Sequence, residues 1–171
     1  DDIDTQTEAM AHFVERELAR SRIGPVTAAS TSVLGVVKRM VNAISKLPSN
    51  NVIDWQIDIA EEITAPFDEF NLLEMLGNLL DNAREWTKDL IVISVAKTDG
   101  RVWLTIKDNG PGLEETQLSE VLKRGKRLDP TRQGTGLGLA IVQDLAESLG
   151  CELTLKNAKN GGLMVTLGWQ A

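Results

Sequence analysis

Two asparagines stand one helical turn apart in the segment Asn78-Leu79-Leu80-Asp81-Asn82-Ala83. Residues four apart share one face of a helix, and asparagine is a weak helix former, so the pair needs a reason. A carboxamide oxygen is a hard, neutral ligand for Mg²⁺, which takes few protein ligands and completes its octahedron with phosphate and water. The two amides could equally hydrogen-bond nearby loops, and this motif alone favours neither interpretation.

A second motif, Asp108-Asn109-Gly110-Pro111-Gly112, directly follows a predicted strand. Its glycines permit unusual backbone angles and the close approach of a ligand. An ionised aspartate at the end of a strand can accept a hydrogen bond from the exocyclic amine of adenine. Asn-Gly and Pro-Gly are also common turn formers, and taken alone this motif favours a plain turn.

The third motif, Gly134-Thr135-Gly136-Leu137-Gly138-Leu139-Ala140, enters a predicted helix. Glycine amides ahead of a helix N-terminus can cradle phosphates. The dinucleotide-binding fingerprint does not fit, because it follows the first strand of a parallel βαβ unit, whereas a long polar loop precedes this motif. The chain also has neither a Gly-Lys-Ser/Thr phosphate loop nor the lysine strand of protein kinases.

Apolar periodicity predicts the elements that must position these motifs. Helices are expected over 5–23, 33–47, 66–86, 115–123 and 139–149, and strands over 52–59, 90–97, 101–107, 151–157 and 163–169. One side of the first strand should carry Ile53, Trp55, Ile57 and Ile59. The buried side of the 66–86 helix should carry Phe67, Phe70, Leu73, Leu76, Leu80 and Ala83. The pattern predicts an α+β two-layer sandwich with a mixed, mostly antiparallel sheet.

The bulk composition narrows the class of protein. The chain has 171 residues with 42% hydrophobic and 25% charged residues, which suits one domain with a short appendage. A formal net charge of -7 argues against non-specific binding of nucleic acid. No apolar run is long enough to cross a bilayer and no signal peptide opens the chain. The single cysteine, Cys151, can form neither an internal disulfide nor a zinc site alone, and a buried strand thiol is expected.

In their order and surroundings, the three motifs resemble the N, G1 and G2 boxes of sensor histidine kinases. These kinases belong to the GHKL superfamily, which also holds the nucleotide domains of Hsp90, gyrase B and MutL. The resemblance covers roughly residues 33–169 and is greatest to PhoQ-type kinases, notably in Arg124-Gly125-Lys126-Arg127-Leu128-Asp129. It implies a catalytic ATP-binding domain with the Bergerat fold over residues 25–171.

The resemblance also implies roles for individual residues. Asn82 would hold the Mg²⁺ of ATP-Mg, with Asn78 assisting in catalysis. Asp108 would recognise adenine, and Gly110 and Gly112 would shape the nucleotide pocket.

The G2 box and the segment before it would serve the phosphates. The expected phosphate contacts are Gly134, Thr135, Gly136, Leu137 and Gly138. Residues 113–133 would form a lid, in which Arg124 and Arg127 either contact phosphate or make a solvated basic patch.

Two positions bear on the activity. Members of the superfamily that hydrolyse ATP typically carry a glutamate where Asn78 stands, and an amide cannot accept the proton of an attacking water. This favours a kinase over an ATPase. Many relatives carry a lysine where Glu85 stands, and a carboxylate beside a triphosphate is repulsive. A docking scaffold that no longer binds nucleotide is therefore an alternative.

The only histidine, His12, lacks the His-Glu/Asp-Leu-Arg-Thr-Pro-like context of a phosphoacceptor. The helix expected over 5–23 instead resembles the second helix of the dimerisation and phosphotransfer hairpin, which makes 1–24 a remnant of that domain. The acceptor helix is then absent, and the chain should bind ATP without phosphorylating itself. The expected partners are that helix, a response-regulator receiver domain and a second copy in a homodimeric parent. The domain should be cytoplasmic, with the parent anchored in the inner membrane.

Overall fold

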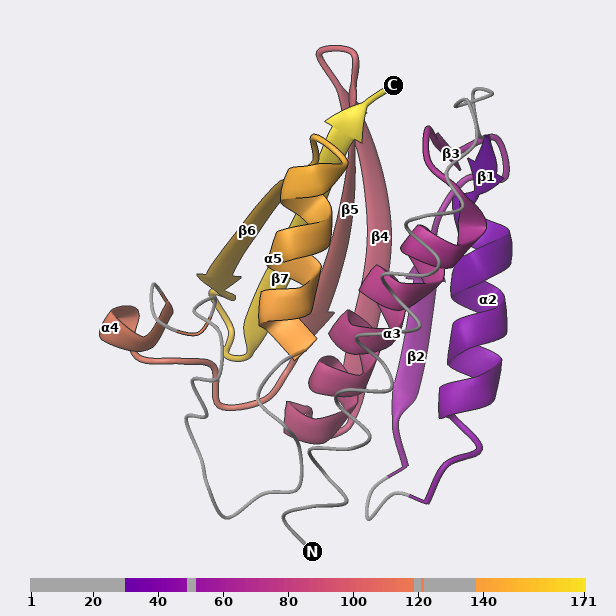
Figure 1. Ribbon diagram of the computed structural model, residues 1–171. Coiled ribbons are helices and arrows are strands. Elements are labelled where there is room, and N and C mark those ends of the chain that lie inside the picture. Colours follow the sequence, from indigo (N-terminus) through magenta and orange to yellow (C-terminus); the bar gives the residue numbers. More distant parts are fainter. Residues whose placement is uncertain (1–29, 49–51, 119–120, 122–137) are drawn as a thin grey trace, which may run out of the picture.

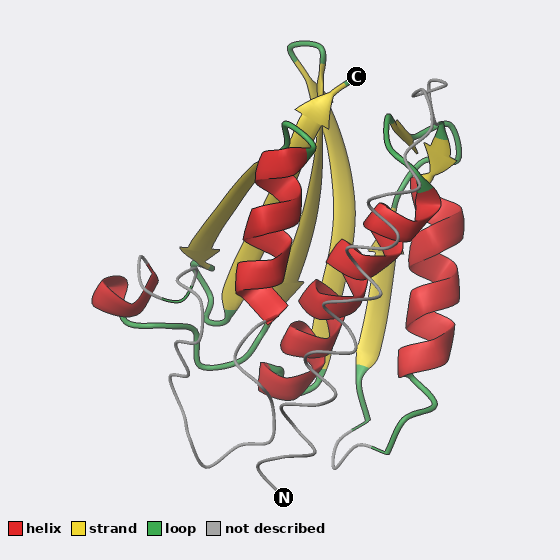
Figure 2. Cartoon of the chain, viewed as in Figure 1, coloured by secondary structure: helices red, strands yellow, loops and turns green. Residues whose placement is uncertain are grey.

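The computed structural model of the chain describes residues 30–48, 52–118, 121 and 138–171. Three helices lie against one face of a five-stranded sheet, which makes two layers (Figures 1 and 2). The helices of this layer are α2 (Val33–Ile44), α3 (Glu69–Trp86) and α5 (Gly138–Ser148). A fourth, short helix is α4 (Glu115–Leu118). The predicted α+β two-layer architecture is confirmed.

The sheet has the strand order β2-β4-β5-β7-β6. Its strands are β2 (Asp54–Asp58), β4 (Leu90–Thr98), β5 (Arg101–Asp108), β6 (Glu152–Asn157) and β7 (Leu163–Gln170). Only β2 and β4 pair in parallel, and the other pairs of the sheet are antiparallel, as predicted. The pairing of Ile91 with Asp108 brings the start of β4 beside the end of β5. The second motif therefore begins next to the connection between α3 and β4.

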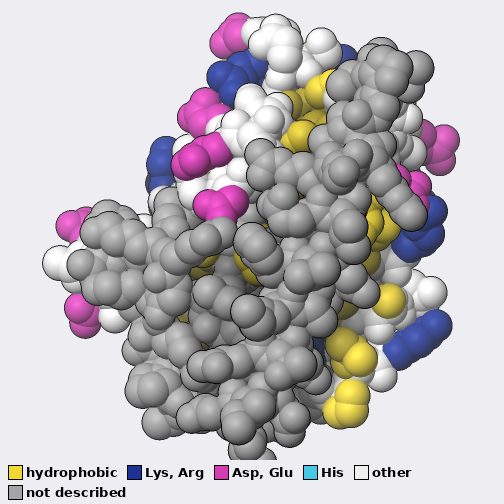
Figure 3. Space-filling view, in the orientation of Figure 1, with side chains coloured by type: hydrophobic (Ala, Val, Ile, Leu, Met, Phe, Trp, Pro, Cys, Tyr) yellow, Lys and Arg dark blue, Asp and Glu magenta, His cyan; other side chains and the backbone are white. Residues whose placement is uncertain are grey.

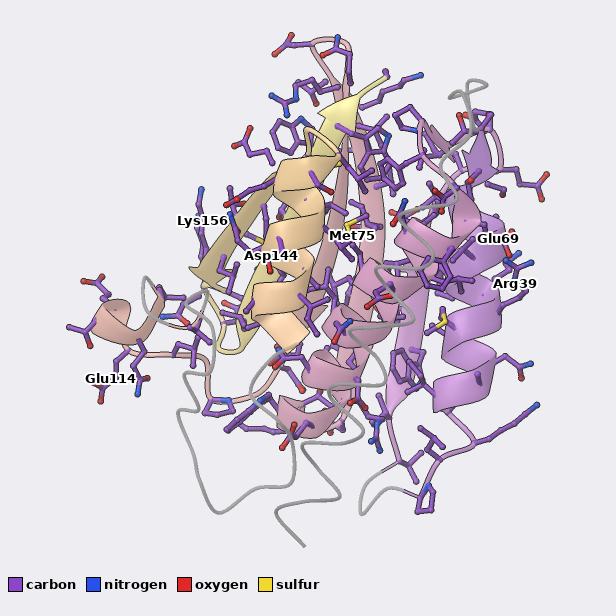
Figure 4. The ribbon with its side chains drawn as sticks, viewed as in Figure 1. Arg39, Glu69, Met75, Glu114, Asp144 and Lys156 are labelled. Atoms are coloured by element: carbon purple, nitrogen blue, oxygen red, sulfur yellow. The ribbon has the colours of Figure 1, made fainter. Side chains whose placement is uncertain are left out.

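Apolar faces hold the helices to the sheet, and side chains cap the N-termini of α2 and α3. Ser32 accepts a hydrogen bond from the backbone of Gly35 at the start of α2, and Asp68 accepts one from Asn71 at the start of α3. The buried residues of α3 are Leu72, Met75, Leu76, Leu79, Leu80 and Ala83. Figure 4 shows Met75 pointing from α3 toward the sheet, whereas Arg39 and Glu69 meet at the surface. Each such large apolar side chain contributes about 1.5–3 kcal/mol on burial, which fixes the face that α3 turns outward.

The prediction that Phe70 is buried is wrong, because 56% of its surface is exposed. Asp68 caps α3, so the helix begins at Glu69 rather than Pro66. Phe67 precedes the helix and packs edge-on against Trp169, with ring centroids 5.6 Å apart. Phe70 lies two residues before Leu72, about 200° around the helix, and so faces away from the core.

Smaller differences concern the edges of the fold. Two-residue strands, β1 (Thr31–Ser32) and β3 (Thr64–Ala65), pair with each other and were not predicted. Cys151 precedes β6 and is only half-buried, so the expectation of a buried strand thiol is wrong. The helix expected over 5–23 lies outside the described residues, as does most of the lid expected over 113–133. Within the described ranges, no helix is both long and apolar enough to cross a membrane.

Candidate functional site

Asp108, the last residue of β5, is buried with 3% of its surface exposed. Its Oδ1 accepts a hydrogen bond of 2.7 Å from the backbone N–H of Gly110. The backbone N–H of Leu163, at the start of β7, lies 3.3 Å from both carboxylate oxygens. The carboxylate is therefore oriented by two backbone segments, and Oδ2 keeps more acceptor capacity than Oδ1.

Burial raises the pKa of the Asp108 carboxyl above its usual value, whereas the hydrogen bonds from Gly110 and Leu163 act in the opposite direction. A buried carboxylate fixed by backbone donors is suited to recognising one hydrogen-bond donor of a ligand. The geometry thus allows the adenine contact expected of Asp108 without testing it.

Glycines let neighbouring backbones come close to this aspartate. A Cβ at Gly110 would overlap the carbonyl oxygen of Trp86, the last residue of α3. A Cβ at Gly162, whose φ is +90°, would overlap the carbonyl oxygen of Asp108. Gly110 was predicted as a pocket residue, whereas Gly162 was given no role in the sequence analysis. The Gly161-Gly162 pair was the available signal, because two successive glycines permit positive φ and close approach.

Asn157, at the end of β6, was not predicted as a functional residue. Its Oδ1 accepts from the backbone N–H of Leu113 at 2.9 Å, and its Nδ2 donates to the carbonyl oxygen of Leu113 at 2.6 Å. Gly112 has a φ of +73°, and a Cβ there would lie 2.7 Å from Asn157 Oδ1. The side chain therefore pairs with the backbone just after the second motif, as a neighbouring strand would.

The two asparagines of the first motif lie in α3, and both are half-buried. Asn78 Nδ2 donates to the carbonyl oxygen of Glu74 at 2.8 Å, and a Cβ on Gly138 would lie 3.0 Å from Asn78 Oδ1. Within the part of the chain that the structure describes, the Asn82 side chain has no hydrogen-bond partner. Glu85, one turn further on, is half-buried and engaged in a contact. The amide oxygen of Asn78 thus lies beside the start of α5.

Helix α3 carries the first motif and lies against described residues of the other two. Asn78 lies against Gly138, the last glycine of the third motif and the first residue of α5. Trp86, one turn after Asn82, contacts Gly110 of the second motif. Arg124 and Arg127 lie outside the described residues, as do Gly134, Thr135, Gly136 and Leu137, so their predicted contacts stay predictions. No group of three or more metal-binding side chains of the His, Cys, Asp or Glu type occurs among the described residues.

On the face drawn in Figure 3, Lys and Arg side chains lie close to Asp and Glu side chains at the described surface.

Residues 67–170 match the family model described as histidine kinase-, DNA gyrase B- and HSP90-like ATPase. Sensor protein kinase CarS of Pseudomonas aeruginosa is 47% identical over 102 residues, which are 60% of this chain and 23% of that protein. Virulence sensor histidine kinase PhoQ of Salmonella typhimurium is 28% identical over 130 residues, 76% of this chain and 27% of that protein. The chain therefore spans about a quarter of the length of these curated relatives.

Solved structures of similar fold are also histidine kinases. The mycobacterial sensor histidine kinase MprB matches with a TM-score of 0.73 at 22% identity, over 84% of this chain and 97% of that one. The catalytic domain of histidine kinase ThkA matches with a TM-score of 0.69 at 20% identity, over 83% of this chain and 94% of that one. At these identities the likeness establishes the fold.

Proposed function

This chain belongs to the family of histidine kinase-, DNA gyrase B- and HSP90-like ATPases, and from that membership we propose that it binds ATP with Mg²⁺ and donates the γ-phosphoryl group to a histidine of a sensor kinase. The phosphoryl group is then relayed to the receiver domain of a response regulator. The relatives described as sensor kinases, CarS and PhoQ, support this choice within the family.

The observation that carries the proposal is the convergence of the three motifs on α3. Asp108 presents its buried carboxylate to adenine, while Asn82 binds Mg²⁺ through its amide oxygen. Asn78 lies beside Gly138, where the glycine-rich segment enters α5 and its N–H groups can meet the phosphates. Mg²⁺ supplies charge neutralisation on the phosphates, and phosphoryl transfer of this kind depends mainly on positioning and electrostatic stabilisation.

An amide at position 78 favours a kinase over a hydrolase. Asn78 donates to the carbonyl oxygen of Glu74, and its own oxygen has no basicity with which to activate water. An enzyme that transfers phosphoryl to protein benefits from such a lack of hydrolysis. A docking scaffold that does not bind nucleotide is the second candidate function, because the carboxylate of Glu85 would repel a triphosphate beside it.

We further propose that residues 25–171 form the catalytic domain and that 1–24 belong to the dimerisation and phosphotransfer hairpin. The acceptor histidine lies on a separate helix of a homodimeric parent protein, since His12 has the wrong context. The parent is anchored in the inner membrane with this domain in the cytoplasm. This chain alone then binds ATP without autophosphorylating, and a polypeptide carrying the acceptor helix restores transfer from labelled ATP.

The proposal is tested by calorimetric titration of ATP with and without Mg²⁺, on the unaltered chain and on Asn82→Ala. The unaltered chain should bind ATP more tightly when Mg²⁺ is present, and Asn82→Ala should bind equally in both conditions. Asn42→Ala is the matched control, because Asn42 is an exposed helical asparagine on α2. An identical response to Mg²⁺ in Asn82→Ala and the unaltered chain removes the metal role of Asn82. Absence of ATP binding by the unaltered chain favours the docking scaffold.

A further inference from the structure

Asn109 directly follows Asp108, and its side chain hydrogen-bonds the connection between α3 and β4, about twenty residues earlier in the chain. We propose that Asn109 is a positioning residue, which holds the end of α3 that carries Asn82 in register with Asp108. The inference rests on the proposed binding of ATP-Mg. It gives a role to Asn109, a residue of the second motif to which the sequence analysis assigned none.

The amide oxygen of Asn109 collects the donors of the α3–β4 connection. Thr87 Oγ1 lies 2.9 Å from Asn109 Oδ1, and the backbone N–H groups of Lys88, Asp89 and Leu90 lie at 3.0, 3.2 and 3.2 Å. A carboxamide oxygen has two lone pairs, so these donors share it. All the residues from the end of α3 to the start of β4 are thereby gathered around one atom of the second motif.

The amide nitrogen of Asn109 makes a second contact with the same connection, and in this contact Asn109 is the donor. Asn109 Nδ2 donates to Asp89 Oδ1 at 2.7 Å. The pair needs a donor at one position and an acceptor at the other, because two carboxylates at this distance would repel each other. The connection is thus held through both ends of one side chain.

Neighbouring contacts extend the connection from Asn109 to the helix. The backbone N–H of Thr87 donates to the carbonyl oxygen of Ala83, the residue after Asn82, and this bond closes the last turn of α3. Gly110 lies so close to the carbonyl oxygen of Trp86 that a side chain would overlap it. A displacement of the α3–β4 connection would therefore move the last turns of α3 relative to Asp108. Asn82, the proposed Mg²⁺ ligand, is in those turns.

A swap of the Asn109–Asp89 pair tests the inference. Asn109→Asp places two carboxylates face to face, and we expect the Mg²⁺-dependent gain in ATP affinity to fall by about 10-fold. Asp89→Asn keeps a donor and an acceptor and should stay within about 2-fold of the unaltered chain. The double variant Asn109→Asp/Asp89→Asn inverts the hydrogen bond, since the carboxylate at position 109 accepts from both the connection and the amide introduced at position 89. Its ATP affinity should return to within about 2-fold of the unaltered chain.

Asp54→Asn is the matched control for charge. Asp54 starts β2 at the same edge of the sheet, opposite Leu90, but its carboxylate accepts from Gln56 and not from Asn109. Removing this charge in the Asn109→Asp background should restore nothing. Titrations are run with and without Mg²⁺, at a temperature well below the unfolding midpoint of every variant. A purely structural role would change the midpoints and leave the Mg²⁺ dependence of the folded protein unchanged.

Each outcome bears on one claim. An unchanged Mg²⁺ dependence in Asn109→Asp overturns the positioning role, as does failure of Asp89→Asn to rescue it or equal rescue by Asp54→Asn. Should Asn109→Asp fail to fold, the double variant decides, because weak Mg²⁺-dependent binding in a folded double variant also overturns the role. Absence of ATP binding by the unaltered chain overturns the proposed function instead, which separates the two failures.

Discussion

Asp108 and Asn82 lie in the same candidate site but are held in different ways. Asp108 is buried, its carboxylate accepts from two backbone segments, and glycines bring those segments against it. Asn82 stands on a half-buried helix face, and none of the described residues hydrogen-bonds its side chain. The Asp108 end of the site is thus held by backbone contacts between described residues, whereas the described residues make no hydrogen bond to the side chain at the Asn82 end.

This difference separates two kinds of effect. A buried polar network loses free energy when any member is removed, because the remaining groups are left unpaired. A helical amide on a half-buried face can be replaced by alanine with little cost, since alanine is the better helix former. Substitutions around Asp108 should therefore change stability and ligand binding together, whereas substitutions of the α3 asparagines should change binding alone.

The largest effect is expected for Gly162→Ala. Its positive φ costs an alanine about 1–2 kcal/mol, and the overlap with the Asp108 carbonyl oxygen adds about 1–3 kcal/mol. The free energy of unfolding should fall by about 2–5 kcal/mol, as measured by urea denaturation. ATP affinity should fall as well, because the carboxylate of Asp108 is displaced.

Gly150→Ala is the control for backbone conformation alone. Gly150 also has a positive φ, +67°, but nothing lies within 4 Å of an added Cβ. Its loss should stay near the ~1 kcal/mol of the left-handed conformation, with unchanged ATP affinity. Equal losses in the free energy of unfolding for the two variants would show that the close contact between Gly162 and Asp108 does not contribute to stability.

The contrast between the two ends also marks what could be predicted from the sequence. Local apolar spacing is sufficient to place α3 and the strands along the chain and to identify most of the residues that they bury. The packing of Asn157 on Leu113 joins residues 44 apart, and the bond from Leu163 to Asp108 joins residues 55 apart. No local pattern determines such contacts, and so the side chains that complete the Asp108 end were missed.

The position of Phe70 shows a related weakness. Helical spacing alone allows a stripe that includes Phe70, and only the cap at Asp68 decides that Phe67 precedes the helix and packs on Trp169. The motif residues could be named from their types and order, whereas the support of Asn109 for the α3–β4 connection depends on the sheet register. The elements and layers of the fold could therefore be predicted from local patterns, whereas the long-range side-chain contacts that join the motifs could not.

Asp108→Asn should have the next largest effect. The amide can keep its oxygen toward the N–H of Gly110, which places an NH₂ group where Oδ2 lies, facing the adenine amine in the proposed complex. ATP affinity should weaken by about 1–3 kcal/mol, the cost of an unsatisfied buried polar group, in a calorimetric titration. Unchanged affinity would remove Asp108 from the nucleotide site.

Lowering the pH should weaken ATP binding by the unaltered chain, because it protonates the Asp108 carboxylate. Because burial raises the pKa of Asp108 in the folded protein, the carboxylate needed for adenine is lost at a higher pH than for an exposed aspartate. The folded state favours the protonated form of Asp108, and so protonation of this carboxyl contributes to the free energy of unfolding. That contribution is fully present below the pKa of the unfolded state and disappears as the pH rises through the pKa of the folded state. ATP affinity should show the opposite trend, and Asp108→Asn should lack this dependence.

The smallest effect on stability is expected for Asn78→Ala, which tests the other end of the site. The substitution loses one side-chain hydrogen bond to the carbonyl oxygen of Glu74, worth about 0.5–1.5 kcal/mol, and gains up to about 0.7 kcal/mol in helix propensity. The free energy of unfolding should therefore stay within about 1 kcal/mol of that of the unaltered chain. Affinity for ATP-Mg should fall by about 5–10-fold, because a loss of about 1–1.4 kcal/mol lies within the net contribution of one hydrogen bond.

Urea denaturation and calorimetric titration on the same preparations separate these two quantities. The Asn42→Ala variant on α2 gains the same helix propensity at an exposed position and should bind ATP-Mg as the unaltered chain does. A loss of several kcal/mol of stability in Asn78→Ala would mean that the contact of Asn78 with Gly138 is part of the core packing between α3 and α5. The Asp108 end and the α3 end of the site would then not differ, since contacts within the folded protein would hold both of them in the absence of ligand.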